Sequence, residues 1–225
     1  MVKGIIFDYN GTMYFDHEYN VESWKEVYRK ITGSLEGFDE LLRESYSINN
    51  GTLIKMFGQK VNKQLSESEI EELSLEKERT YQEFCLKNGE NKLSPGTVEA
   101  IEYFLKNNYK INICTASIKY NVDFYFENTN LDKWFDRSLV AYDNKNCLGK
   151  VEMYIEAAKN INLDPKECLV FEDSKKGIED AIKAGFNKII HVNNYHIPSV
   201  DYPEVLCEIE DFAKLDYSLF DKNLL

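Results

Sequence analysis

Three short apolar runs in the sequence each end at a polar residue. They are residues 4–7 before Asp8, residues 111–114 before Thr115, and residues 168–171 before Glu172 and Asp173. Apolar runs of about four to eight residues, bounded by turn signals, are typical of buried strands. In parallel sheets, ligands bind just beyond the carboxyl ends of the strands. We therefore expect these polar side chains to meet at one edge of a sheet, although they lie far apart in the sequence.

Downstream of residue 94, helix and strand patterns alternate. After a turn at Ser94-Pro95-Gly96, the pattern predicts helices over 97–107, 119–128, 150–160 and 175–184, and strands over 110–115, 138–142, 167–172 and 188–192. Together with a first strand over 3–9, this order is typical of βαβ units and a parallel sheet. Asn10-Gly11 predicts a tight turn, with residues 12–15 as the return arm of a hairpin. Beyond residue 192 we expect a short strand or helix.

The segment between about residues 18 and 86 has helical periodicity. The stretch VESWKEVYRKI places its apolar residues on one helix face, and Ser66 with Glu69 matches a capping box at the start of a longer charged helix. We predict an α/β protein with a Rossmann-like parallel-sheet core, formed by residues 1–15 and 91–225. An α-helical cap, residues 16–90, is predicted to be inserted after the first strand.

Composition narrows the class of function. Hydrophobic residues make up 43% of the 225 residues, which is enough for a sizeable core, and the net charge of −12 argues against nucleic acid or an anionic membrane as the main partner. No run approaches the roughly 18 apolar residues of a membrane span, and the opening MVKGIIFDYN does not resemble a signal peptide. The cysteines, at 85, 114, 147, 168 and 207, form no CxxC pair, so we expect reduced thiols in a cytoplasmic protein.

The residues at the predicted strand ends resemble the motifs of the haloacid dehalogenase-like hydrolases. DYNGT at residues 8–12 resembles the first motif, Thr115 the second, Lys150 the third, and FEDSKKGIEDAIKAG the fourth. Ser94-Pro95-Gly96 resembles the return to the core after a helical cap. The closest subgroup is that of the β-phosphoglucomutase-like and phosphoglycolate phosphatase-like members. The resemblance implies a Rossmann-like core, an Asp nucleophile, Mg²⁺ and a small phosphorylated metabolite as substrate; we expect a monomer.

The chemistry of phosphoryl transfer supports this interpretation independently. A carboxylate at a strand end can attack phosphorus and form an aspartyl phosphate, which makes Asp8 the candidate nucleophile. Mg²⁺ prefers carboxylate oxygens, phosphate and water, so Asp8 and Asp173 are expected ligands, with Glu172 nearby or bound through water. The resemblance adds the backbone carbonyl of Asn10 as a ligand. In the alternative interpretation, Asp8 only caps the Asn-Gly turn, and Glu172-Asp173-Ser174 only caps the next helix.

Further residues are expected to hold the phosphoryl group. Thr115 would donate its hydroxyl, and the backbone N–H groups of Ala116 and Ser117, ahead of the next helix, would add anion-binding donors. A lone Thr after a strand is, however, usually a helix cap. The first motif adds Thr12 as a substrate-binding residue.

A cation is expected beside the phosphate. The resemblance implies that Lys150 brings its positive charge to the phosphate and to Asp8. Most lysines are simply solvated, so this role depends on the resemblance more than on the spacing. Lys145 is a second candidate for the same role.

Position 10 departs from the family pattern. Phosphatases of the family usually carry there a second Asp, which protonates the leaving oxygen and then activates water. An Asn amide exchanges no proton near neutral pH. General acid–base catalysis is typically worth 10²–10⁴-fold, or roughly 3–5 kcal/mol of the barrier. Two alternatives follow: the acid comes from elsewhere, with Asp16 and His17 as candidates, or the substrate is an acyl phosphate, whose leaving group needs no acid.

Two other functions stay open at this point. Family members that cleave carbon–phosphorus or carbon–halogen bonds also lack the second Asp, and the phosphonate-cleaving branch uses a cap lysine as a Schiff base. Lys55 and Lys60 lie in a plausible region, but surface lysines are the simpler interpretation. Alternatively, the protein binds a phosphorylated ligand without turnover and acts as a sensor or partner-binding module.

Two further groups of residues have simpler explanations. The aromatic side chains of Trp24, Tyr28, Phe38 and Tyr46 could line a substrate pocket, but their helical spacing is more typical of a core. His191 lies on a predicted strand, and the three histidines of the sequence are too scattered for a metal cluster.

Overall fold

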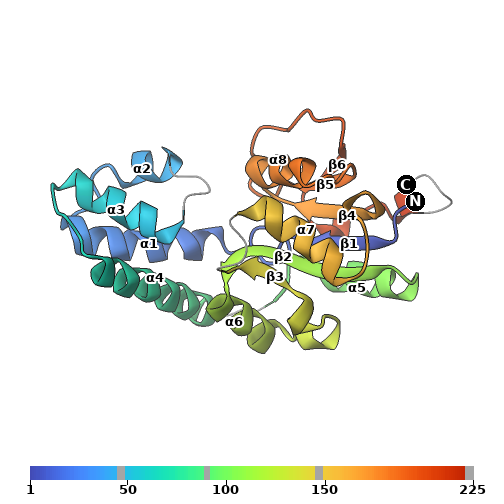
Figure 1. Ribbon diagram of the computed structural model, residues 1–225, viewed down its shortest axis with the longest axis horizontal. Coiled ribbons are helices and arrows are strands. Elements are labelled where there is room, and N and C mark those ends of the chain that lie inside the picture. Colours follow the sequence, from blue (N-terminus) through green and yellow to red (C-terminus); the bar gives the residue numbers. More distant parts are fainter. Residues whose placement is uncertain (45–48, 89–91, 145–148, 221–225) are drawn as a thin grey trace. The chain divides into compact units, whose positions relative to one another are not determined.

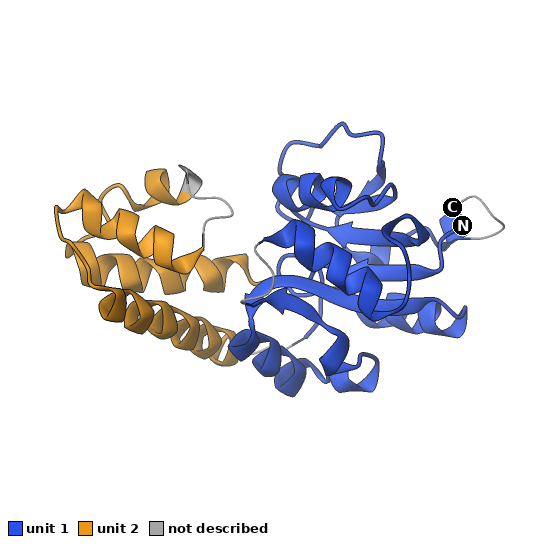
Figure 2. Cartoon of the chain, in the orientation of Figure 1, with its two compact units in different colours: residues 1–15, 92–225 blue, residues 16–91 orange. Residues whose placement is uncertain are grey.

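The chain folds into two compact units (Figure 2). The computed structural model describes residues 1–44, 49–88, 92–144 and 149–220. The core unit consists of residues 1–15 and 92–225, and the helical unit of residues 16–91. Each unit has its own cluster of buried apolar side chains. That the helical unit acts as a cap stays a prediction.

A six-stranded parallel sheet forms the middle of the core unit (Figure 1). The strands are β1 Gly4–Phe7, β2 Lys110–Ile118, β3 Ala141–Asp143, β4 Cys168–Glu172, β5 Ile189–Val192 and β6 Val205–Ile209. Their order across the sheet is β3-β2-β1-β4-β5-β6. The connections on the two sides of β1 run in opposite directions across the sheet, which makes the carboxyl end of β1 the switch point where such sheets bind ligands. The expected Rossmann-like α/β fold is confirmed.

Helices cover both faces of this sheet. They are α5 Thr97–Lys106, α6 Lys119–Thr129, α7 Lys150–Asn160 and α8 Lys175–Lys183, with short 3-10 turns at Leu131–Lys133, Arg137–Leu139, Pro165–Glu167, Phe212–Lys214 and Tyr217–Phe220. Side chains of α7 and α8 pack around Ile6 and Val170 on one face. On the other face, the ring of Phe7 stacks on Phe171 with 5.3 Å between centroids. Neighbouring residues of β1 are thus buried on opposite faces, as in sheets covered on both sides.

The first strand is shorter than the sequence predicts. It ends at Phe7 because the carbonyl of Tyr9 accepts hydrogen bonds from the amides of residues 12, 13 and 14, which turns the chain back. The hairpin arm expected over residues 12–15 is therefore part of this turn. The chain returns from the helical unit beside it, where the Ser94 hydroxyl donates to the Thr12 carbonyl over 2.9 Å.

Two other strands differ from the expected bounds. β2 continues to Ile118, three residues beyond its expected end at 115. The strand expected over 138–142 is replaced in its first part by the 3-10 turn Arg137–Leu139, because the side chain of Asp136 accepts from the Ser138 amide and caps that turn. β3 then begins at Ala141.

The helical unit contains α1 His17–Thr32, α2 Phe38–Glu44, α3 Asn50–Lys60 and α4 Glu67–Lys87. The predicted capping box is present, because Ser66 and Glu69 each bond to the other's backbone amide. Trp24, Tyr28 and Phe38 are buried with Phe57 in the core of this unit. They are core residues, as their spacing indicated, and Tyr46 lies outside the described residues.

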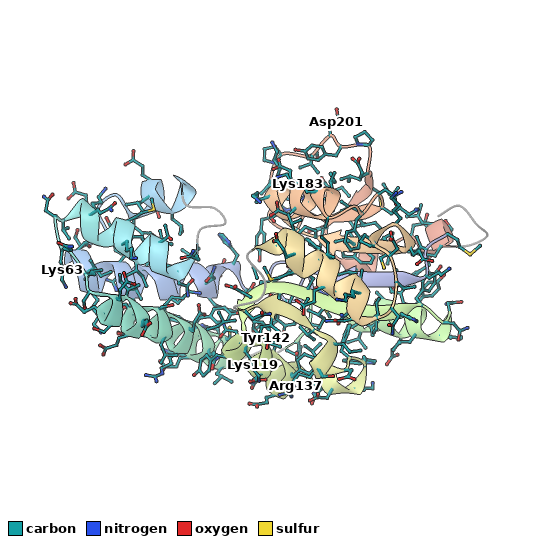
Figure 3. All side chains as sticks on the ribbon, viewed as in Figure 1. Lys63, Lys119, Arg137, Tyr142, Lys183 and Asp201 are labelled. Carbon is teal, nitrogen blue, oxygen red and sulfur yellow. The ribbon has the colours of Figure 1, made fainter. Side chains whose placement is uncertain are left out.

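Charged side chains lie mostly on the outside of the two units, as Lys63, Lys119 and Lys183 illustrate (Figure 3). Lys77 is an exception, buried inside the helical unit beside Glu78. Among the helices in the described ranges, none combines the length and the hydropathy that crossing a membrane requires.

Candidate active site

The turn after β1 joins two of the predicted site residues. Asp8 directly follows the strand, and its amide still donates to the Phe171 carbonyl of β4. The turn centred on Tyr9 brings Thr12 back toward the strand end, where its hydroxyl donates to Asp8 Oδ2 over 3.2 Å. Asp8 and Thr12 are both buried. Thr12 thereby holds Oδ2 of Asp8 and leaves Oδ1 available to other partners.

Three carboxylates meet at this edge of the sheet. Oxygen atoms of Asp8, Glu172 and Asp173 all lie within 4.8 Å of one another. Gly11 allows this approach: it has φ +78°, and a Cβ at this position would lie 2.2 Å from Asp173 Oδ2. Carboxylate oxygens at such spacing fit a hard divalent cation, for which Mg²⁺ is the common choice beside a phosphate. Glu172 and Asp173 follow β4, so the juxtaposition follows from the parallel pairing of β1 with β4.

Lys150 inserts its ammonium group between two of these carboxylates. Its Nζ lies 2.8 Å from Asp8 Oδ1 and 2.7 Å from Glu172 Oε2. Lys150 is the first residue of α7, which follows β3. Burial alone would lower the pKa of Lys150, but the facing carboxylates of Asp8 and Glu172 raise it well above its ordinary value. The lysine is therefore charged at any physiological pH. The competing Lys145 lies outside the described residues.

Glu172 is held by more hydrogen bonds than its neighbours. Its Oε2 accepts from the Tyr154 hydroxyl as well as from Lys150. Its Oε1 accepts from the Ser174 hydroxyl over 2.7 Å and from the Ser174 amide over 3.2 Å. Gly177 is required beside it, because a Cβ there would lie 2.0 Å from Oε1. With both oxygens engaged, Glu172 is placed to orient Lys150 and to bind a cation through water.

The electrostatics distinguish the three carboxylates. Burial, together with the charge of Glu172, raises the pKa of Asp8 from 3.8 to about 7, even though Lys150 acts in the opposite direction. Burial and the charges of Glu172 and Asp8 also raise the pKa of Asp173 well above its ordinary value. Burial would raise the pKa of Glu172 too, but Lys150 and the hydroxyl donors hold it below its ordinary value. Full ionisation of the three carboxylates would place three negative charges against the one positive charge of Lys150, and a bound cation would offset this excess.

Asn10 lies in a network of hydroxyl groups. Its Oδ1 accepts from Ser117 over 2.9 Å and from Thr115 over 3.2 Å. Its Nδ2 donates to the Tyr125 hydroxyl of α6 over 2.9 Å. The ring of Tyr125 stacks on Tyr9, with centroids 4.0 Å apart, which fixes the position of the phenol. Each polar atom of the amide therefore has a defined partner, and Thr115 directs its hydroxyl proton to Asn10.

The backbone around Ala116 and Ser117 differs from the expected geometry. Both residues belong to the extended part of β2, and α6 begins only at Lys119, so their amides are not in the first turn of the helix. The Ser117 amide instead donates to the Thr115 hydroxyl over 3.1 Å. Ala116 is exposed. That these amides bind phosphate stays a prediction.

Several candidates from the sequence are not part of the cluster in the core unit. Asp16 and His17 belong to the helical unit, where Asp16 is buried and accepts from the Tyr81 hydroxyl. Lys55 is exposed and pairs with Glu67 over 3.0 Å. Lys60 is also exposed.

The expectation of thiols agrees with the described cysteines. None of them is in a disulfide: Cys85, Cys114 and Cys168 are buried and Cys207 is half-buried. Cys147 lies outside the described residues. Buried thiols in this arrangement fill space as small apolar side chains.

Sequence reasoning missed two tyrosines at this site. Tyr154 follows Lys150 by four residues, and side chains at that spacing share a helix face, so the helix predicted over 150–160 already contained the signal. Tyr125 carried no comparable signal, because its contact with Asn10 depends on how α6 packs against the sheet. Ser174 was predicted as part of a helix cap, and its hydroxyl does accept from the Gly177 amide over 3.0 Å.

Comparison with known proteins gives consistent matches. The family described as haloacid dehalogenase-like hydrolase matches residues 2–185. A curated relative from Thermotoga maritima, named phosphorylated carbohydrates phosphatase, is 25% identical over 205 residues, which is 85% of either chain.

Solved structures share the fold over nearly the whole chain. A family IA hydrolase from Entamoeba histolytica has a TM-score of 0.85 and 26% identity and covers 96% of both chains. A β-phosphoglucomutase from Clostridium difficile has a TM-score of 0.76 and 20% identity and covers 98% of this chain and 96% of its own. The latter likeness, at this identity, shows the fold alone.

Proposed function

Because the chain belongs to the haloacid dehalogenase-like hydrolase family, we propose that it is a Mg²⁺-dependent phosphatase, or a phosphomutase-like enzyme, acting on a small phosphorylated metabolite. The name of the Thermotoga maritima relative favours a phosphorylated carbohydrate. The observation that carries the proposal is the cluster in which Lys150 lies between Asp8 and Glu172, with Asp173 beside them. The expectation of a hydrolase is confirmed by the family match.

In the first proposed step, a carboxylate oxygen of Asp8 attacks the phosphorus of the substrate. The bond between phosphorus and the leaving oxygen breaks, and its electron pair stays on the leaving oxygen. Lys150 orients Asp8 and would face the phosphoryl oxygens. The Thr115 hydroxyl, which donates to Asn10, would rotate and donate to a phosphate oxygen instead. Mg²⁺, held by Asp8, Asp173, the Asn10 carbonyl and, directly or through water, Glu172, would offset the negative charge of the phosphoryl group.

In the second step, water attacks the phosphorus of the aspartyl phosphate, releases inorganic phosphate and restores the Asp8 carboxylate. With an alkyl phosphate both steps require a proton transfer that the Asn10 amide does not provide, whereas with an acyl phosphate only the second step does. We propose that the enzyme favours substrates with good leaving groups, and that hydrolysis of the aspartyl phosphate is its slow step. Asp16 and His17 stay candidates for the acid or base.

A second candidate function is ligand binding without turnover. The network around Asn10 favours it, because the amide is fixed by hydroxyl groups at the position where the family usually has its acid and base. In that case the same cluster would bind a phosphorylated ligand, and the protein would act as a sensor or partner-binding module.

A phosphatase screen distinguishes the two candidates. Wild type, Asn10→Asp and Asp8→Asn are assayed with Mg²⁺ on a panel of sugar phosphates, other alkyl phosphates and acyl phosphates. The phosphatase proposal expects turnover by the wild type on at least one compound, faster turnover by Asn10→Asp, and none by Asp8→Asn. Tight binding of a panel compound by the wild type without turnover supports the ligand-binding candidate. Turnover that survives in Asp8→Asn contradicts the proposed nucleophile.

A further inference from the structure

We propose that His191 is a positioning residue that fixes Asp173 for cation binding through a hydrogen bond to its backbone. His191 lies on β5 and is fully buried. Its Nε2 lies 3.0 Å from the backbone carbonyl oxygen of Asp173. This proposal rests on the proposed function, because Asp173 is a cation ligand only in that account.

The direction of this hydrogen bond follows from its atoms. A backbone carbonyl only accepts, so His191 Nε2 carries the hydrogen and donates it. On the opposite side of the ring, Nδ1 lies 3.0 Å from Glu208 Oε2 of β6. This second bond needs a hydrogen of its own, carried by Nδ1 or by the Glu208 carboxyl, because an imidazole nitrogen and a carboxylate oxygen without one both only accept. An imidazole held at both nitrogens cannot rotate or flip without losing one of these bonds. Glu208 therefore fixes the ring, and the ring fixes the Asp173 carbonyl.

The register of the sheet explains why His191 can reach this carbonyl. Glu172 of β4 pairs with His191 of β5, and His191 pairs with Glu208 of β6. Asp173 is the first residue beyond the end of β4. The imidazole thus holds the carbonyl of Asp173 just where regular pairing between strands stops.

Asp173 is consequently constrained at both ends. Its carboxylate packs over Gly11, where a Cβ would come within 2.2 Å of Oδ2, and its carbonyl is held by His191. Oxygen atoms of Asp8 and Glu172 lie within 4.8 Å of this carboxylate, and like charges at that spacing repel. A fixed backbone opposes a movement of Asp173 away from them and keeps the three carboxylates close enough to share a cation. Partners that orient a ligand residue in this way are typically worth about 10–100-fold in metal affinity.

Two substitutions at position 191 keep or remove the hydrogen-bond donor at the place of Nε2. In His191→Gln, the amide nitrogen occupies roughly the place of Nε2 and can still donate to Asp173. In His191→Asn, the shorter side chain reaches only toward Glu208. The proposal predicts that His191→Asn weakens binding of Mn²⁺, measured without substrate by electron paramagnetic resonance, by about 10-fold or more. The Mn²⁺ affinity of His191→Gln should stay within about three-fold of that of the wild type.

The half-saturating Mg²⁺ concentration for turnover should rise in parallel, with a smaller change in kcat at saturating Mg²⁺. Ile190→Val, at the neighbouring buried position of β5, is the matched control: it removes a methylene from the core and should leave Mn²⁺ affinity unchanged.

If His191→Asn does not fold, Glu208→Leu replaces it, since the Glu208 side chain is 37% exposed and lies away from β4. This variant should weaken Mn²⁺ binding by about three-fold or more.

The outcomes separate this proposal from the proposed function. If the wild type binds Mn²⁺ and His191→Asn binds it equally well, the positioning role is wrong while the cation site stands. Equal losses of Mn²⁺ affinity in His191→Gln and His191→Asn also contradict the role, because they would show that a donor kept at the place of Nε2 does not preserve cation binding. A wild type that binds no divalent cation overturns the cation site and this proposal together.

Discussion

The side-chain amide of Asn10 donates to the hydroxyl of Tyr125 over 2.9 Å. This contact places an amide, held by a neutral phenol, where the related phosphatases usually carry a proton-transferring carboxylate. The partners of Asn10 are hydroxyl groups that can rotate, so a carboxylate at position 10 would find donors in Ser117, Thr115 and Tyr125 without moving the backbone.

We therefore predict that Asn10→Asp folds normally and hydrolyses alkyl phosphates faster than the wild type. The expected gain in kcat is about 10²-fold, at the lower end of what general acid–base catalysis supplies. Steady-state kinetics on one sugar phosphate measures it. Asn10→Ala serves as the control, because it also disrupts the hydroxyl network but supplies no acid; a similar gain in Asn10→Ala would show that the carboxylate is not the cause.

The leaving group should matter more to the wild type than to Asn10→Asp. An acyl phosphate releases a carboxylate, which needs no proton, whereas an alkyl ester releases an alkoxide, which does. We expect the ratio of kcat/KM for acyl over alkyl phosphates to be about 10²-fold larger in the wild type than in Asn10→Asp. Equal kcat/KM values of the wild type on both substrate classes would remove the idea that the missing acid shapes its specificity.

Removal of the Lys150 charge should destabilise the protein as well as inactivate it. Lys150→Met leaves the buried carboxylates of Asp8 and Glu172 facing each other without the lysine ammonium group that lies between them. Breaking a buried ion pair by removing one partner costs about 3–5 kcal/mol. Urea unfolding in EDTA tests this against Lys183→Met, an exposed lysine on α8 (Figure 3), which should change stability by less than about 1 kcal/mol. Equal stabilities of the two variants would contradict the arrangement.

The pKa of Asp8 predicts an unusual dependence of stability on pH. Because this pKa rises from 3.8 to about 7 on folding, the metal-free native state binds more protons than the unfolded state between these values. Stability therefore falls as the pH rises through this window, by at most about 4 kcal/mol from this group. The raised pKa of Asp173 acts in the same direction.

Asp8→Asn should flatten that profile. Urea unfolding in EDTA at pH 5 and pH 8 compares the two proteins: the wild type should lose clearly more stability over this range than the variant does. Saturating Mg²⁺ should reduce the loss in the wild type, since a cation offsets the charge that burial makes costly. The same pH slope in both proteins would mean that Asp8 does not titrate in this range.

Much of this site could be predicted because it depends on strand ends. Apolar runs that stop at Asp8 and Glu172 required only the rule that parallel strands present their carboxyl ends on one edge. Thr115 lies inside β2, three residues before its end, so the rule placed it only near that edge. The turn after β1 was harder, since its residues could equally form a hairpin arm. What decided it was the carbonyl of Tyr9, which collects several amides and ends the strand early.

The contacts that could not be predicted depend on packing between elements distant in sequence. Tyr125 reaches Asn10 because of the way α6 lies on β2, and periodicity does not determine this. The link from His191 to Asp173 depends on the pairing of β5 with β4, and the sequence showed only that position 191 lies on a strand. In both cases the sequence shows the residue types but not which residues they contact.

The proposed mechanism requires that Asp8 carries the phosphoryl group during turnover. Acid quenching of the wild type with Mg²⁺ and a substrate labelled in its phosphoryl group, followed by peptide mapping, tests it most directly. Label is expected on the peptide that contains Asp8, sensitive to hydroxylamine, absent from Asp8→Asn, and longer-lived in the wild type than in Asn10→Asp. Steady turnover with no labelled protein at any quench time, or label on another residue, would contradict it.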